Sequence, residues 1–183
     1  MNRSLVLCAL ILALIDLPLT AEGAGGVETR QILGSDFSSA APPLTTIGGY
    51  GYGVTEDGTM IGGWGMAVLS KSVLTSPKGT GYAAGYGGVL QGWQHRWGFI
   101  VGNATTRVGF GGVDEAAGPG DDGSAAGFSM LEMAEAHLGI LIFPWFDIGV
   151  TGGVVGTLTF TAADPFRIGY APMVGIRIGW GAY

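Results

Sequence analysis

Two stretches of the chain alternate between large apolar residues and small or polar ones over many residues. In 147–160 the face of even positions carries Ile148, Val150, Gly152, Val154, Gly156, Leu158 and Phe160. In 168–180 the corresponding face carries Ile168, Tyr170, Pro172, Val174, Ile176, Ile178 and Trp180. A period of two is the signature of a β-strand. Strands this long exceed the roughly five or six residues usual in globular proteins, and crossing a bilayer at a tilt needs only about 9 to 11.

The same reading divides the chain into eight predicted strands: 27–34, 45–54, 59–70, 80–95, 99–112, 126–142, 147–160 and 167–182. The connections between them alternate between long and short, and Asp57-Gly58 is a hairpin signal in one of the short ones. This layout predicts an all-β fold, an antiparallel up-and-down barrel of about eight strands of the transmembrane type. A helix over 129–142 is an open alternative, because that segment is rich in helix formers.

Composition agrees with a membrane barrel. Glycine makes up 36 of 183 residues, charged residues are 12%, and the mean hydropathy is +0.42. Glycine is costly inside helices, and no long apolar segment follows the first residues to account for the apolar total. The net charge of −6 is the wrong sign for a nucleic-acid partner.

The first residues form a segment of their own. Arg3 precedes an apolar run over 4–15, Pro18 ends that run, and small residues follow it. This order is typical of a secretory signal peptide. We therefore expect residues 1–23 to be a signal peptide, with cleavage after either Ala21 or Gly23, and 24–183 to be a single barrel domain. The only cysteine, Cys8, lies in that signal, so we expect neither a disulfide nor a cysteine-bound metal in the exported chain.

Aromatic residues gather near the ends of the predicted strands. Amphipathic rings settle at the two interfaces of a bilayer. One predicted belt, at the end with short turns, includes Tyr50, Tyr52, Trp93, Trp97, Trp145 and Trp180. The loop over 113–125 should lie at the opposite end from Trp145, exposed and mobile, because it is rich in Gly, Pro and Asp.

With its signal, eight strands, alternating loop lengths and the aromatic Tyr183, the chain resembles the small eight-stranded outer-membrane barrels of Gram-negative bacteria. The likeness is one of pattern and covers roughly residues 27–183. It implies an outer-membrane location, a lipid bilayer as surroundings, and recognition of the terminal aromatic by the outer-membrane assembly machinery. Self-association into a homo-oligomer is a further expectation.

Few charged residues lie inside the predicted strands. A narrow lumen could pair them, because an unpaired buried charge is costly. The predicted lumenal ion-pair network comprises Arg107, Glu132, Glu135, His137 and Arg177, although Glu132 falls on the apolar face. Arg177 should pair with Glu135. A proton path or a polar ligand site is the alternative to a purely structural network.

Nothing in the sequence argues well for catalysis, a cofactor or a metal. The best nucleophilic set is Ser129, Glu135 and His137, which share one strand face. Ser129 and His137 are eight residues apart, which is about 26 Å along an extended strand, so they cannot touch. We therefore expect no enzyme.

Two functions remain open. The first is an outer-membrane barrel with a structural, narrow-pore or loop-display role. The second is a soluble periplasmic or extracellular glycine-rich β-protein that binds an apolar ligand or self-assembles. A soluble barrel keeps its large apolar residues inside, so the direction in which the apolar face points separates the two.

Overall fold

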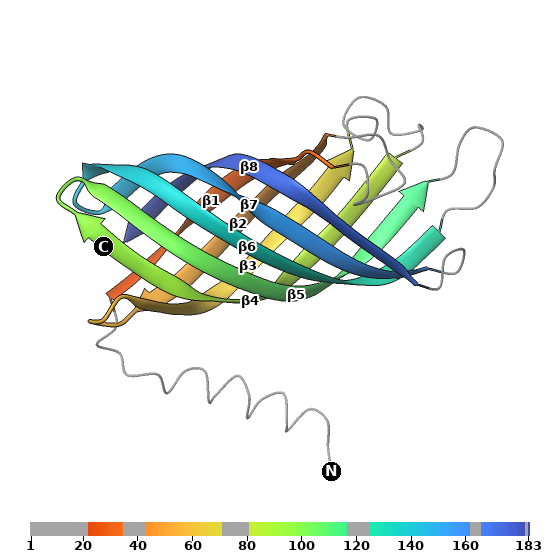
Figure 1. Cartoon of the computed structure of the whole chain (residues 1–183), viewed down its shortest axis with the longest axis horizontal. Coiled ribbons are helices and arrows are strands. Elements are labelled where there is room, and N and C mark those ends of the chain that lie inside the picture. The colour runs from red at the N-terminus through yellow and green to blue at the C-terminus, as the bar shows by residue number, and fades with distance from the viewer. Residues whose placement is uncertain (1–21, 35–42, 71–80, 117–124, 162–165, 182) are drawn as a thin grey trace, which may run out of the picture.

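The computed structural model describes residues 22–34, 43–70, 81–116, 125–161, 166–181 and 183. They form eight strands: β1 (Glu22–Ile32), β2 (Leu44–Val54), β3 (Thr59–Ser70), β4 (Gly81–Trp97), β5 (Ile100–Ala116), β6 (Ala125–Phe143), β7 (Phe146–Thr161) and β8 (Arg167–Gly181). Each strand pairs antiparallel with the next, and β8 pairs with β1, so the barrel is closed (Figure 1). The fold prediction is confirmed, and the helix alternative over 129–142 is wrong, because that segment lies in β6. Among the described residues, no helix is long and apolar enough to cross a membrane.

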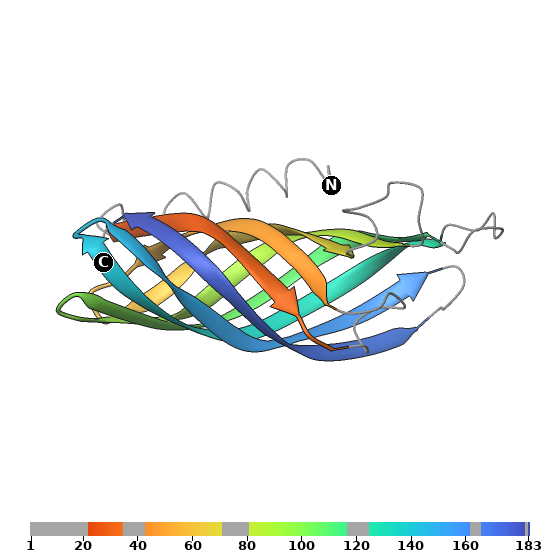
Figure 2. The same cartoon turned by 90° about the horizontal axis from the view of Figure 1, so that it is seen from above.

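The two ends of the barrel differ in their connections. At the turn end, the short segments 55–58, 98–99 and 144–145 join successive strands. At the loop end lie the connections over 33–43, 71–80, 117–124 and 162–166. Figures 1 and 2 show the strands running obliquely between these ends. Of the loop predicted over 113–125, residues 113–116 and 125 extend β5 and β6, and 117–124 lie outside the described residues. That connection does join its strands at the end opposite Trp145.

The inside and outside of the wall follow the predicted phase on β7 and β8. Val154 and Ile176 point outward and are 57% and 52% exposed, whereas Val155 and Met173 point inward and are 1% and 2% exposed. The large apolar faces therefore cover the outside of the barrel. This is the reverse of a soluble barrel, where apolar side chains fill the interior.

The first strand begins earlier than predicted. β1 starts at Glu22, and residues 1–21 lie outside the described residues. The prediction began this strand at residue 27. The side chains of Glu28 and Arg30 on this strand point into the lumen and are buried.

Inward-facing glycines let aromatic rings lie flat against the wall. A Cβ added to Gly111 on β5 would come within 2.7 Å of the ring of Tyr86 on the neighbouring β4. The turn 55–58 needs a glycine for another reason, because Gly58 has a φ of +87°, which is strained for other residues. Glycines such as Gly111 thus make room in the wall of the barrel for the aromatic ring of a neighbouring strand.

Candidate functional site

An ion-pair quartet crosses the lumen from β1 to β5 and β6. Arg30 Nη1 donates to Glu28 Oε1 at 2.7 Å, and its Nη2 donates to Glu135 Oε2 at 2.6 Å. Arg107 Nη1 and Nη2 donate to the two carboxylate oxygens of Glu28 at 2.5 and 2.9 Å, and Nη2 also donates to Glu135. Each of the four side chains is at most 1% exposed.

The quartet is neutral, with two cations and two acids. Removing an ion from water costs several kcal/mol, which is offset only when each charge has well-placed partners. The Thr105 hydroxyl adds a hydrogen bond to Glu135 Oε1 at 3.1 Å. Because β1 and β5 lie four strands apart in the barrel order, the quartet joins opposite walls and fills the middle of the lumen.

A second polar cluster surrounds Arg177 on the turn-end side. Arg177 Nε donates to the Tyr50 hydroxyl at 2.5 Å, Nη1 to Asn103 Oδ1 at 3.1 Å, and Nη2 to the Tyr52 hydroxyl at 3.0 Å. Its guanidinium also lies 4.1 Å from the centroid of the Tyr50 ring, a cation–π contact. The predicted pairing of Arg177 with Glu135 is therefore wrong: Arg30 and Arg107 take Glu135, and neutral groups hold Arg177.

Nearer the turn end, His137 on β6 lies beside Asp147 on β7, with Nε2 and Oδ2 2.9 Å apart. The Tyr183 hydroxyl donates to the other oxygen of Asp147. Glycines leave room for this group, since a Cβ on Gly139 would lie 2.7 Å from His137 Nε2. A carboxylate beside an imidazole can orient its ring and fix its tautomer.

The residues considered for nucleophilic chemistry do not form one site. Ser129 Oγ lies 3.0 Å from Thr159 Oγ1, while His137 binds Asp147 and Glu135 belongs to the quartet. Within the described ranges, no group of three or more His, Cys, Asp and Glu side chains could hold a metal ion.

Three of the predicted site residues lie elsewhere than expected. Glu132 points outward and is exposed, as the strand phase requires, so it does not belong to the lumenal network. Tyr50 and Tyr52 were predicted in the interface belt, but they are 8% and 5% exposed and stack on each other inside the lumen. On β2 the lumenal face carries the large aromatic side chains and the outer face carries Gly49, Gly51 and Gly53, so a prediction that places large rings outside fails on this strand.

The sequence prediction also missed half of the quartet and one partner of His137. Glu28 and Arg30 are spaced two apart, which puts both on one strand face and is a signal that could have found them. Asp147, next to the turn 144–145, was likewise absent from the predicted network. Arg107, Glu135, His137 and Arg177 all lie in the lumen with less than 7% exposure.

The outer surface carries two aromatic belts. Near the turn end, Trp93, Trp97, Trp145 and Trp180 point outward and are 47–57% exposed. Near the loop end, the exposed rings are Phe110, Phe128, Phe160, Phe166 and Tyr170. The side chains that face outward between the belts are mostly aliphatic or small. Such a surface matches the interfaces and hydrocarbon core of a bilayer.

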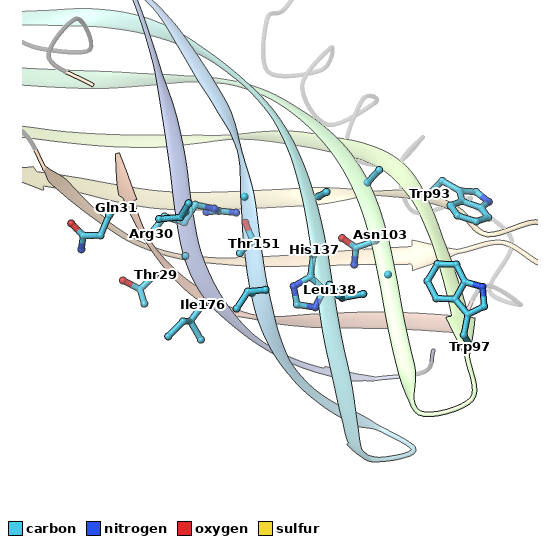
Figure 3. A pocket seen from close by; sticks show the side chains of 17 residues that line it. Thr29, Arg30, Gln31, Trp93, Trp97, Asn103, His137, Leu138, Thr151 and Ile176 are labelled. Atoms are coloured by element: carbon cyan, nitrogen blue, oxygen red, sulfur yellow. The ribbon is translucent and has the colours of Figure 1, made fainter. Parts of the chain in front are cut away.

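A shallow groove of about 960 Å³ runs along this outer wall. In Figure 3, Trp93 and Trp97 of β4 stand on one side of it, and Thr29, Gln31 and Ile176 of β1 and β8 stand on the other. Small residues lie between these sides, including Ala104, Ala136 and Gly152. The groove thus lies on the outer wall of the barrel.

Apolar side chains make up most of the loop-end half of the lumen, with the buried hydroxyls of Ser70, Ser129 and Thr159 among them. The apolar side chains come from seven of the strands and are each at most 2% exposed: Ile32, Leu44, Val68, Tyr82, Leu131, Met133, Val155 and Met173. Eight-stranded barrels generally have room only for side chains inside. This apolar plug and the quartet lie in series along the lumen.

Among solved structures, the barrel is similar to neisserial surface protein A, with a TM-score of 0.57 at 7% sequence identity, covering 88% of this chain and 95% of that one. The fold is that of the small outer-membrane β-barrels. Weaker similarities are to Ail, the attachment invasion locus protein of Yersinia pestis (TM-score 0.46, 13% identity, 87% and 97% covered), and to the outer membrane protease OmpT from Escherichia coli (0.38, 10%, 88% and 94%). No protein-family model and no curated protein sequence matches the chain.

Proposed function

We propose that this chain is a non-conducting barrel of the outer membrane that presents its loop-end connections at the cell surface. The observation that carries the proposal is the inverted wall, which has aliphatic side chains outside between two aromatic belts and charged side chains inside. Such a wall is stable only where lipid replaces water outside. The expected signal peptide supports export to that membrane.

The filled lumen supports a barrel that does not conduct. Ions would have to pass the buried quartet, whose four members hold one another, and then the apolar plug. Removing one partner of a buried ion pair leaves the remaining charge uncompensated, which costs about 3–5 kcal/mol. Thermal opening of the quartet should therefore be rare, which argues against the narrow-pore role.

Display of the connections is the role that remains for a closed, rigid wall. The three turn-end connections are short, whereas those at the loop end are all longer. Long connections on a rigid scaffold commonly carry binding functions. No catalytic step is proposed, because the best candidate nucleophile and base bind other partners.

Two experiments test this function. The mature chain is first incorporated into a planar bilayer, and its insertion is verified by protease protection. We expect no current above that of the bare membrane; unitary current steps from verified, inserted protein would overturn the closed lumen.

For display, an epitope is inserted between Pro119 and Gly120, and the matched control carries it in the turn 144–145. Antibody should bind the first variant on intact cells and the control only after the outer membrane is opened. The reverse pattern would contradict the proposed orientation.

A further inference from the structure

Polar side chains on the outer wall fall into two groups. On β1 and β2 they have partners within the chain: the Thr29 hydroxyl donates to the Thr46 carbonyl at 2.9 Å, and Gln31 Nε2 donates to Thr45 Oγ1 at 3.1 Å. On β4, β5 and β6, the exposed side chains of Gln91, Thr106 and Glu132 make no hydrogen bond to any described residue. We call these three residues the outer polar cluster.

The cluster lies between the aromatic belts. Gln91 is directly opposite Thr106 in the β4–β5 register, and Thr106 is opposite Ala134, two residues from Glu132. Glu132 is four residues from Phe128 of the loop-end belt, which is about 13 Å along the strand. In hydrocarbon, an unsatisfied polar group costs several kcal/mol, so a partner outside this chain should satisfy the cluster.

The surface around the cluster permits close approach. A hollow of about 670 Å³ is lined by Gln91 and Thr106 together with small residues that include Ala104, Ala134 and Gly152. Glu132 lines a second hollow of about 390 Å³. Membrane interfaces combine small residues, which let backbones approach, with polar side chains that bond across the contact.

We propose that this face of β4–β6 binds a second copy of the chain, with a two-fold axis along the membrane normal close to Thr106, the middle member of the cluster. The proposal rests on the membrane location proposed above. Such an axis keeps every residue at its own depth, so the outer polar cluster of one copy meets that of the other. Strands β4, β5 and β6 lie side by side in Figure 1.

The chemistry of the cluster is self-complementary. An amide and a hydroxyl each contain both a donor and an acceptor, and a carboxyl oxygen accepts. The Gln91 amide and the Thr106 hydroxyl of one copy can therefore donate to the Glu132 carboxyl of the other, so two identical clusters can satisfy each other. None of the described arginines faces outward between the belts: Arg30, Arg107 and Arg177 lie in the lumen, and Arg96 and Arg167 lie at the two ends.

Disulfide cross-linking in outer membranes tests the contact, in the full chain with Cys8 replaced by serine so that each variant holds one cysteine. Ala134→Cys places a thiol next to Glu132. The matched control is Gly51→Cys on β2, four strands away, where an added Cβ meets nothing within 4 Å. We expect oxidation to give a dimer band for Ala134→Cys and a monomer for Gly51→Cys.

Adding Glu132→Leu to Ala134→Cys should reduce the dimer yield by about tenfold, the scale of one polar contact in a membrane, while the barrel stays folded. Folding and insertion are read separately, from heat-dependent gel migration and detergent extraction. A monomeric Ala134→Cys chain that is folded and inserted, equal dimer yields at the two positions, or a cross-link to another protein would overturn this proposal alone. If Ala134→Cys fails to fold, the outward-facing Ala136→Cys replaces it. A chain found outside the membrane would overturn the proposed function instead.

Discussion

At the scale of single residues, Arg107 is the side chain on which the lumen depends most. It holds both Glu28 and Glu135 in a site that water does not reach. Arg107→Met should lower the free energy of unfolding by about 3–5 kcal/mol, because it leaves two buried acids with Arg30 as their one remaining cation in the quartet. Urea unfolding of the barrel in lipid vesicles measures this loss. Adding Glu28→Gln should recover part of it, and a loss below about 1 kcal/mol in the single variant would mean that the quartet is not a buried ion-pair network.

The Arg177 cluster gives a second residue-scale prediction. In a double-mutant cycle, Arg177→Met and Tyr50→Phe should couple by about 1–3 kcal/mol, because they share a hydrogen bond to a charged group. The cycle of Arg177→Met with Glu135→Gln is the matched control and should show a coupling below about 0.5 kcal/mol, since the two residues have different partners. The opposite ranking would restore the pairing expected from the sequence.

The turn between β2 and β3 contains a carboxylate outside the membrane-spanning strands. The Thr55 hydroxyl, together with the amide and hydroxyl of Thr59, donates to Asp57 and holds the pKa of its carboxyl below the usual range. A lowered folded pKa means that the stabilisation is present above the unfolded value of about 3.9 and is lost as pH falls through the folded value.

We therefore expect the amide signal of Thr59 in NMR spectra to shift with a midpoint below about 3.9. In Asp57→Asn, the Thr59 signal should not follow that titration. A midpoint at or above the ordinary aspartate value would show that these hydrogen bonds do not hold the turn.

At the scale of elements, the inward or outward phase of a strand was predicted correctly where its two faces differ clearly in side-chain size and hydropathy. β7 and β8 have one large apolar face, so their phase was predicted from the sequence. β2 has its large rings on the lumenal face and glycines outside, so Tyr50 and Tyr52 were predicted on the wrong side of the wall. β1 was predicted to start five residues too late, because residues 22–26 show no apolar alternation. The partners within the quartet depend on which strands face each other across the lumen, and no pattern within one strand carries that information.

The outward phase of β7 leads to a prediction about charge. Val154 is 57% exposed near the middle of the strand, where we expect hydrocarbon. Val154→Arg should cost about 2–4 kcal/mol in lipid vesicles, whereas Val154→Leu should change stability little. A similar stability for the two variants would indicate that this face is in water.

At the scale of the whole molecule, a single fact connects the wall, the lumen and the two ends: the barrel is apolar outside and charged inside. Glycine and the small charged fraction made the class of fold predictable. The stacking of quartet and plug along the lumen was not predictable, because it follows from the register between strands, which similar sequences can set differently. The filling of the lumen is therefore known from the structure and could not be predicted from the sequence.

The most direct test of this account is a spin-label scan along β7 in lipid vesicles, with one cysteine at a time over 147–160 in a chain without Cys8. We expect accessibility to oxygen, which dissolves in lipid, to peak at the even positions, while a water-soluble nickel chelate collides little with any of them. A nickel chelate that reaches Val150 and Val154 as readily as it reaches a label in the turn 55–58 would contradict a membrane-spanning barrel.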